Sequence, residues 1–589
     1  MSQAWTTMLG RRIQAGDRGA PAGDAVVDAA PGLAERVALM VIFPLTILLR
    51  SFYVFRHGFD SDEWQHLHVV WAATRGLTQY RDVFDNHAPL FHILSVPLVA
   101  SLGETPDILY VMRLAITPFV VITLWATCLM GRSIGGRRTG LWAAAVLGFV
   151  PLFFLRSIEY RPDVLWTMFW ILALAVLLGG DLTWRRCLAT GLLLGLAVST
   201  SLKSVLLLLA LGIAVIALPI ASGRGTRSLA PPRPLACALA FVFGLSVVPV
   251  ALVVYFASRG LLQPFLYGTV YHNYLPQLGS WSRPLRSLFF APALLLVVVL
   301  ARCAGRARRP EKDRVRLVFL TLVAGTFLAA LHTIWPLFTT YDLLPFYPLL
   351  AVLAVGVPMR RPALAAAATP PMAGSLRLSG AFLLSAVVLI EIGLVLRWEP
   401  PGLDGTRRQV QLMTDVLRLT ESSDYVLDMK GESIFRRRPI YYVLEAITRA
   451  RLERGFFPDN IRERIIATRT CVAAARIDRF PDGVREFIES NYLLLGEVRV
   501  AGRYLDVQDQ DPGRPIAFEV AIPARYSVVA ESGGAAGLLD GEPYTGPRFL
   551  EAGPHTFTPS SAADRLALVW AQAIERGFTP FPDGTATGR

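Results

Sequence analysis

Long apolar runs are the feature of this sequence that most restricts its fold. About eleven runs approach the roughly 20 residues that an α-helix needs to cross the hydrocarbon core of a bilayer. Hydrophobic residues make up 53% of the chain and charged residues 17%, and the mean hydropathy is +0.46. A water-soluble core cannot take up so many such runs, so the sequence predicts a polytopic α-helical membrane protein. The runs lie near 34–55, 107–130, 139–156, 164–180, 187–201, 204–221, 235–257, 285–301, 317–335, 343–358 and 378–397.

Arginine-rich connections between these runs predict the orientation of the chain. Every second connection is rich in arginine, and such loops of membrane proteins face the cytoplasm. With an odd number of spans, this places the N-terminal tail, residues 1–33, in the cytoplasm and the long C-terminal region outside. The same bias accounts for much of the net charge of +13, so we infer no nucleic-acid binding from it. The arginine-rich connections are 131–138, 183–186, 222–234, 301–316 and 359–377.

Two further features bear on the compartment. The first apolar run is too long for the core of a signal peptide, and no small-residue cleavage pattern follows it, so we expect an uncleaved membrane anchor. No Asn-x-Ser/Thr acceptor sequence occurs in the segments expected outside, which favours a bacterial inner membrane over the endoplasmic reticulum. We therefore expect a multi-pass inner-membrane protein with a periplasmic C-terminal region.

The composition changes near Glu399, where a linker containing proline and glycine begins. Residues 34–398 are expected to form the transmembrane domain. Residues 399–510 mix helix and strand signals, which predicts a periplasmic α/β domain. Residues 511–589 hold short strands separated by turn residues, which predicts a β-sandwich-like domain. The helices expected after the linker lie near 407–421, 440–454 and 482–490, and the strands near 425–429 and 493–505.

Asp62 and Glu63 stand side by side in the first outer segment, FDSDEWQHLH. If residues 61–75 form a helix, Asp62 and His66 share one face and the apolar side chains share the other. This pattern predicts an interfacial helix with its aromatic side chains toward lipid and its acidic face toward water or protein. The apolar face comprises Trp64, Leu67 and Trp71.

Two other interpretations of this segment remain open. Asp62 could cap the helix, with Ser61 or Asp60 nearby, because side-chain oxygens at a helix N-terminus accept hydrogen bonds from free backbone N–H groups. Asp62, Glu63 and His66 could instead bind a divalent cation, although no spacing fixes the geometry of such a site.

Five histidines fall within one 36-residue stretch of the same segment. A solvated loop could collect them by chance, and the polar vestibule of an active site would collect them for proton transfer or phosphate contact. The sequence favours neither explanation. The five are His57, His66, His68, His87 and His92.

Charged residues also occur at the outer ends of later spans, where an unpaired charge is expensive. Asp163 opens one span in the sequence RSIEYRPDVLW, with Arg161 beside it. A local Arg–Asp pair at the helix start after Pro162 would explain both residues, as would a functional role. Lys203 interrupts an apolar stretch where the chain turns back at the outer face; it could snorkel to the headgroup region or hold an anionic headgroup.

Several motifs in a fixed order make the first part of the chain similar to a known family. DEWQHLHVVWAATRGLTQYRDVFDNHAPLFHIL is followed by GRSIGGRRTGLWAAAVLG, by EYRPDVLW and later by TTYDLLPFYPLLAVL, which has a Tyr-x-x-x-Pro-x-x-Pro pattern. This order resembles the GT-C membrane glycosyltransferases, in particular family 39 and its bacterial relatives, including the aminoarabinose transferases. The resemblance covers residues 35–400 in organisation and 60–170 in motif.

The resemblance implies a polyprenyl-phosphate sugar donor and an acceptor reached from the outer side. It marks Asp62, with Glu63, as the candidate base and Asp163 as the second-loop carboxylate. Transfer needs deprotonation of an acceptor hydroxyl and neutralisation of a departing lipid phosphate. Arg161 and Lys203 are suitable cations for the second task.

One departure from the family pattern concerns the donor phosphate. Many relatives have Lys-Pro-Pro-Leu where this chain has HAPL, so we expect His87 to take over the phosphate contact of that lysine. His66 and Tyr341 are accessory candidates.

The C-terminal region resembles periplasmic domains appended to several bacterial GT-C enzymes, and it could hold an acceptor glycan or pack on the membrane half.

We therefore expect a glycosyltransferase, specifically a hexosyl- or pentosyltransferase, that moves one sugar from a polyprenyl-phosphate carrier to a lipid or glycan acceptor of the cell envelope. The alternatives are a transporter or flippase of lipid-linked sugars and a catalytically inactive glycan-binding relative. A transporter would show internal repeats and broken helices near the bilayer midplane. No cofactor is required by this interpretation, and a divalent cation is the alternative.

Overall fold

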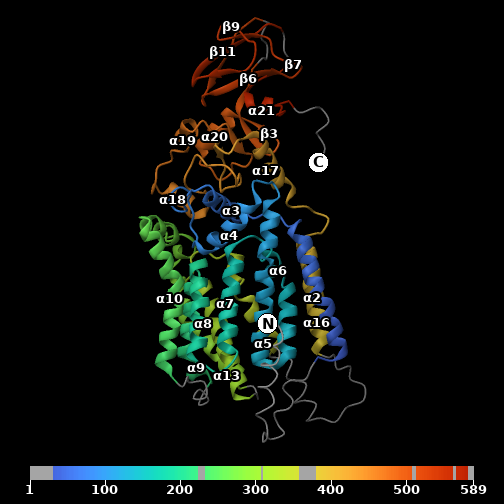
Figure 1. Ribbon diagram of the computed structural model, residues 1–589, viewed down its shortest axis with the longest axis vertical. Helices are drawn as coiled ribbons and strands as arrows, with labels where there is room; N and C mark the ends of the chain where they lie inside the picture. The colour runs from blue at the N-terminus through green and yellow to red at the C-terminus, as the bar shows by residue number, and fades with distance from the viewer. Residues whose placement is uncertain are drawn as a thin grey trace, which may run out of the picture.

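Long apolar helices form the larger N-terminal part of the chain, and strands with short helices form the rest (Figure 1). The computed structural model describes residues 31–222, 233–306, 310–356, 380–506, 513–561 and 565–581. The long helices stand side by side. The strand-rich part, which follows residue 398 and is called the C-terminal half below, lies beyond one end of them. The first 30 residues and most or all of the predicted cytoplasmic connections 222–234 and 359–377 fall outside the described residues.

Within the described ranges, seven helices are long and apolar enough to cross a membrane. Each coincides with at least one predicted span, because a helix satisfies its own backbone hydrogen bonds where no water is available. The predicted polytopic helical architecture is confirmed. The seven are α2 (Leu33–Val54), α5 (Ile108–Phe149), α9 (Ser204–Ser222), α10 (Pro234–Ser258), α12 (Phe290–Gly305, with the 3-10 turn Pro284–Phe289 before it), α13 (Glu311–Thr333) and α16 (Gly380–Trp398).

The predicted count of about eleven spans is not confirmed. α5 contains two predicted spans, which meet at Gly136, where φ is 83°. A Cβ atom on Gly131 would lie 2.7 Å from the Cα of Gly140, so the two halves approach more closely than a side chain allows. The predicted loop 131–138 is therefore a tight turn within helical structure. Other predicted spans form shorter helices, namely α7 (Pro162–Leu178), α8 (Trp184–Thr200) and α14 (Tyr347–Gly356).

The first outer segment forms α3 (Ser61–Thr74) and α4 (Leu90–Leu102) at the junction between the two halves (Figure 1). Asp60 is the N-cap residue of α3, and its side chain accepts from the backbone N–H of Asp62 at 2.9 Å. Glu63 completes a capping box by accepting from the backbone N–H of Asp60 at 2.8 Å. The predicted helix is confirmed, but the interpretation of Asp62 as its cap is wrong because Asp60 fills that position.

The prediction that α3 is an interfacial helix with aromatic side chains toward lipid is wrong. Trp64, Leu67 and Trp71 are 6%, 0% and 3% exposed and belong to the protein core. The C-terminal half covers the helix: Nδ1 of His68 lies 2.8 Å from the carbonyl oxygen of Ile434, 366 positions later in the chain. Periodicity shows only that a helix has an apolar face, and here that face packs on protein.

The linker after α16 attaches the C-terminal half to the ends of the spans. The backbone N–H of Gly405 donates to the carbonyl oxygen of Arg56 at 2.9 Å. The hydroxyl groups of Tyr110 and Thr406 are 2.6 Å apart. The linker is thus joined to the chain just after α2 and to the start of α5, the two ends of the first outer segment.

Of the five helices that the structure describes in the C-terminal half, three correspond to predicted helices, and α19 and α21 were not predicted. The predicted helix 440–454 is shorter, because residues 440–445 form an irregular segment that reaches the first outer segment. There the hydroxyl of Tyr441 donates to the carbonyl oxygen of Tyr80 at 2.5 Å. The helices are α17 (Arg407–Leu419), α18 (Ala446–Glu453), α19 (Ile461–Ala467), α20 (Asp482–Asn491) and α21 (Ala571–Glu575).

Two sheets form the body of the C-terminal half. The first has eight strands along the path β1-β2-β4-β12-β6-β10, with β3 beside β4 and β7 beside β6; the second is β5-β11-β8-β9. β12 pairs antiparallel with both β4 and β6, so the first sheet continues across the boundary expected near residue 510. The two sheets share one apolar core. The strands are β1 (Val426–Leu427), β2 (Val472–Ala474), β3 (Tyr492–Leu495), β4 (Val498–Leu505), β5 (Ile516–Val520), β6 (Ala524–Ala530), β7 (Gly533–Gly534), β8 (Gly537–Leu539), β9 (Glu542–Pro543), β10 (Arg548–Leu550), β11 (Gly553–Pro559) and β12 (Leu566–Trp570).

Candidate functional site

Charged side chains from four parts of the chain form a continuous series of ion pairs beside the start of α3. Nη2 of Arg161 lies 2.5 Å from Oδ2 of Asp62, and its Nε lies 3.3 Å from Oδ2 of Asp163. Nζ of Lys203 lies 2.9 Å from Oδ1 of Asp163 and 2.7 Å from Oδ1 of Asp342. Positive and negative groups alternate, so every charge of this ion-pair series has a compensating neighbour.

Helix ends place these side chains. Arg161 precedes Pro162, the first residue of α7, and Asp163 follows in the first turn. The partial positive charge of the helix N-terminus favours a carboxylate there. Lys203 lies in the turn between α8 and α9, and Asp342 lies in the 3-10 helix Thr340–Leu343. The four ends meet at the side of the bundle that faces the C-terminal half.

Tyr341 contacts the ion-pair series through Arg161. The centroid of its ring lies 3.6 Å from the guanidinium carbon of Arg161, an attractive cation–π contact. Its hydroxyl donates to Glu159 at 2.6 Å. His57 lies between Glu159 and Glu399, at 3.2 and 3.0 Å. Burial lowers the pKa of His57, but the two carboxylates outweigh this effect and raise the pKa to about 9.

Lys430 enters the site from the C-terminal half and binds Oδ1 of Asp62. Asp428, which is fully buried, holds the segment in place by accepting from the backbone N–H of Gly431 at 2.7 Å. Burial lowers the pKa of Lys430. Each oxygen of Asp62 therefore contacts a cation, Arg161 on one side and Lys430 on the other.

Glu63 points away from the ion-pair series. Its carboxylate is 0% exposed and accepts from Nε and Nη2 of Arg113 at 2.8 and 2.5 Å. The backbone N–H groups of Tyr160 and Asp60 donate to it at 2.7 and 2.8 Å. Four donors occupy both oxygens, so the carboxylate has no oxygen open to a substrate.

The predicted metal ligands do not come together, because Asp62 and Glu63 are engaged with arginines. In the part of the chain that the structure describes, one group could hold a metal ion, formed by His66, Asp85 and His87. Burial lowers the pKa of His66, and nearby cationic groups, including those of the ion-pair series, lower it further. This histidine-rich group therefore lies within electrostatic reach of the ion-pair series.

The structure thus brings together four of the residues that the sequence analysis singles out: Asp62, Arg161, Asp163 and Lys203. The interpretation of Lys203 as a snorkelling residue is wrong, because its ammonium group lies between two buried carboxylates. The local pair of Arg161 and Asp163 exists but is one link of a longer series. Tyr341 joins the site through Arg161, whereas His66 and His87 lie in the neighbouring group.

Sequence reasoning missed Lys430 and Asp342. A usable signal was the choice of lysine: of the 58 lysine and arginine residues only three are lysines, namely Lys203, Lys312 and Lys430. Two of the three lie in this site. A compact ammonium group differs from a guanidinium in size and hydration. A lysine in an arginine-rich chain therefore indicates a position where the smaller ammonium group is favoured.

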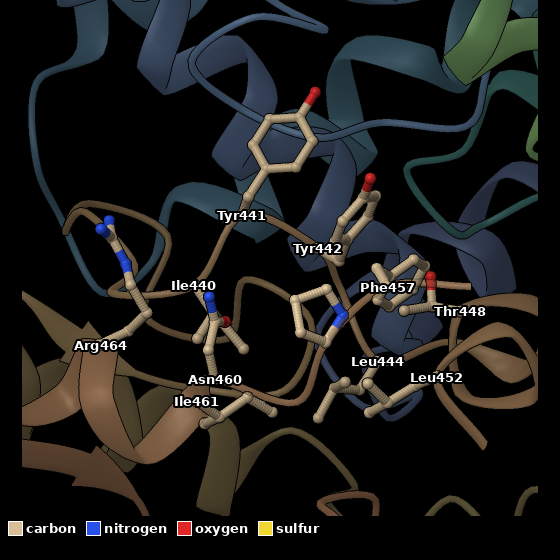
Figure 2. A pocket seen from close by; sticks show the side chains of 11 residues that line it. Ile440, Tyr441, Tyr442, Leu444, Thr448, Leu452, Phe457, Asn460, Ile461 and Arg464 are labelled. Carbon is tan, nitrogen blue, oxygen red and sulfur yellow. The ribbon is translucent and has the colours of Figure 1, made fainter. Parts of the chain in front are cut away.

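A cavity of about 270 Å³ lies in the C-terminal half, beside the irregular segment 440–445 (Figure 2). The rings of Tyr442 and Phe457 stack in its wall with 4.4 Å between centroids. Asn460 and Arg464 add polar groups. A second cavity of about 270 Å³ extends to His68 and Trp71 of α3. The two cavities share Ile440, Tyr441 and Arg464 in their linings. Aromatic walls with a few polar groups are typical of ligand pockets.

A bundle of long helices, a segment between the first two spans and a strand-rich C-terminal half make up a fold that is similar to that of GT-C membrane glycosyltransferases of known structure. The fold of this chain is similar to that of ArnT from Cupriavidus metallidurans. The ArnT structure with bound undecaprenyl phosphate has a TM-score of 0.54 at 15% sequence identity, covering 80% of this chain and 98% of ArnT. The apo structure has a TM-score of 0.52 at 16% identity, covering 79% and 98%.

The apo oligosaccharyltransferase of Archaeoglobus fulgidus is a more distant match, with a TM-score of 0.44 and 13% identity over 88% of this chain and 74% of its own. No family profile matches the chain. No curated protein sequence matches it either.

Proposed function

We propose that this protein is an integral membrane glycosyltransferase that transfers a hexosyl or pentosyl unit from a polyprenyl-phosphate donor to a cell-envelope acceptor on the outer side of the bacterial inner membrane. The observation that carries the proposal is the ion-pair series, in which Asp62 and Asp163 alternate with Arg161 and Lys203 at the ends of spans. The shared fold with ArnT, one structure of which holds undecaprenyl phosphate, supports the same conclusion.

Asp62 is the proposed base. The oxygen of the acceptor hydroxyl attacks the anomeric carbon of the sugar, its proton passes to the carboxylate, and the bond from the sugar to the lipid phosphate breaks. Both oxygens of Asp62 contact cations. The acceptor hydroxyl must therefore displace Lys430 or Arg161 from one oxygen before it can give up its proton.

Arg161 and Lys203 are the proposed cations for the leaving phosphate, which gains negative charge as the glycosidic bond breaks. Preorganised positive charge stabilises such a transition state without reorganisation. Asp163 and Asp342 hold Lys203 in place through ion pairs of 2.9 and 2.7 Å. His87 is proposed as a further phosphate contact and is partly accessible, with 27% of its side chain exposed.

Glu63 and Tyr341 are proposed as positioning residues. Glu63 fixes the start of α3 against Arg113 and the backbone of Tyr160. Tyr341 fixes the guanidinium plane of Arg161.

The N-terminal tail is proposed to lie in the cytoplasm and the C-terminal half in the periplasm, where its aromatic cavity would face the acceptor. A transporter would keep its charged groups near the midplane of the bundle, whereas these lie at helix ends.

The test compares envelope glycans and glycolipids by mass spectrometry from cells with and without this protein. We expect one glycan or lipid class to lose one hexosyl or pentosyl unit, and the wild-type gene to restore it. Asp62→Asn should fail to restore it, while Asp181→Asn, an exposed carboxylate paired with Lys312, should succeed. Loss of the same unit with lipid-linked sugar accumulating on the cytoplasmic side would support a flippase instead, and identical glycans in the two strains would contradict the proposal.

A further inference from the structure

Three side chains that commonly bind metals converge in the first outer segment, next to the ion-pair series. One donor atom from each of His66, Asp85 and His87 lies within 4.8 Å of the other two. The rings of His66 and His87 meet edge to face with 4.5 Å between centroids. His66 and Asp85 are fully buried, and the partly exposed His87 connects the group with solvent.

Nε2 of His66 is the atom that points to a ligand. It is buried and has no hydrogen-bond partner among the described residues, although burying an unpaired polar atom is unfavourable. The other ring nitrogen, Nδ1, lies 2.9 Å from Nε2 of His92. A metal-binding histidine typically uses one nitrogen for the ion and the other for such an orienting hydrogen bond. Because protein encloses this nitrogen, a small ion fits beside it better than a substrate does.

We propose that His66, Asp85 and His87 bind one divalent transition-metal ion, with zinc as the best match. Two imidazole nitrogens, one carboxylate and an open fourth position form the donor set of many zinc sites. Magnesium and calcium prefer oxygen donors throughout. Donors at roughly 2.1 Å from a tetrahedral zinc stand roughly 3.4 Å apart, so small side-chain rotations must close the group around the ion.

The surrounding side chains would orient these ligands. Asp85 accepts from Nε2 of Gln65 at 2.9 Å and from Nε2 of Gln79 at 2.7 Å. When Nε2 of His66 binds the ion, its Nδ1 carries the proton and donates to His92. Nδ1 of His92 then donates toward Asp85, 3.5 Å away. The amide of Gln79, 3.0 Å from the same nitrogen, then keeps only its hydrogen bond to Asp85.

The first experiment measures metal binding directly. Purified full-length protein is stripped with a chelator, dialysed and titrated with Zn²⁺, Mn²⁺ and Mg²⁺ by calorimetry. We expect one zinc ion per chain, weaker binding of manganese and no binding of magnesium. Asp85→Asn and His66→Gln should each lower zinc affinity at least about 100-fold, and His92→Gln about 10- to 100-fold. His555→Gln, which alters an exposed pair with Asp540 on the distant second sheet, should leave it unchanged.

The second experiment uses the wild-type protein and does not depend on the folding of any variant. X-ray absorption at the zinc edge should show two imidazoles and additional oxygen donors at roughly 2.0–2.1 Å. Three results would overturn the proposal: no zinc bound by the stripped protein, zinc bound equally well by Asp85→Asn, or a zinc spectrum without imidazole. None of these measurements uses sugar transfer, so they test the metal site separately from the proposed function.

Discussion

Replacement of Lys203 by methionine separates the two roles that the structure gives to this lysine. Its ammonium group compensates Asp163 and Asp342, which are 3% and 1% exposed. Removing one partner of a buried ion pair costs about 3–5 kcal/mol. Because Asp163 keeps Arg161 as a partner and the Lys203 side chain is 24% exposed, we expect a loss of about 3 kcal/mol, at the lower edge of that range.

The expected effect on catalysis is of a different kind. If Lys203 stabilises the leaving phosphate, its removal should lower kcat by about 10²–10³-fold, as the loss of one preorganised donor does in other enzymes. KM for the donor should rise less, because the charge on the phosphate is greatest in the transition state. The assay follows transfer of a radiolabelled sugar from its polyprenyl phosphate by purified protein in detergent, with thermal unfolding measured in the same buffer.

The double variant Lys203→Met/Asp342→Asn is the decisive control. It removes the uncompensated carboxylate together with its cation, so we expect the unfolding temperature to recover toward that of the wild type while kcat stays low. Lys312→Met, which removes an exposed lysine paired with Asp181, should change neither quantity. Recovery of kcat in the double variant would show that Lys203 only compensates buried charge, and it would refute the assignment to the phosphate.

Three further outcomes follow from the contacts around the site. Glu63→Gln should lower the unfolding free energy by about 3–5 kcal/mol and the unfolding temperature with it, because Arg113 keeps a buried charge; an unchanged melting curve would contradict this. The pKa of His57 rises from 6.5 to about 9, so its contacts with Glu159 and Glu399 together should contribute up to about 3 kcal/mol, present in full below pH 6.5 and lost as the pH rises through about 9. His57→Gln should flatten that part of the stability profile, as measured by unfolding at a series of pH values. Lys430→Met should speed amide hydrogen exchange at the start of α3, while equal exchange in the variant would show that Lys430 does not anchor the helix.

Much of the membrane half could be predicted from the sequence because lipid restricts what an apolar run can do. The spans and their order follow from hydropathy, whereas the orientation inferred from arginine placement stays a prediction. Arg161, Asp163 and Lys203 stood out for the same reason, since a charge at a span end needs a partner. The number of spans was harder to predict, because several predicted spans form helices of 17 residues or fewer, such as α7, α8 and α14.

The partners of these charges could not be predicted, because they depend on contacts between distant parts of the chain. Lys430 reaches Asp62 across 368 positions, and no local pattern indicates that contact. The orientation of α3 failed for a related reason: the amphipathic pattern shows an apolar face but not whether lipid or protein covers it. Glu63 and Asp62 are adjacent in sequence, yet the helix turns one toward Arg113 and the other toward Arg161.

The most direct test of the central claim is a transfer assay with Asp62→Asn and Asp163→Asn in purified, correctly folded protein. Labelled polyprenyl-phosphate sugar is supplied with envelope lipids and glycans extracted from cells that lack the protein, and the labelled product is followed over time. We expect the wild type to transfer the label and Asp62→Asn to lose about 10²–10⁴-fold in rate, with Asp181→Asn as active as the wild type. Wild-type rates in a well-folded Asp62→Asn protein would contradict the assignment of the base and, with it, the proposed active site.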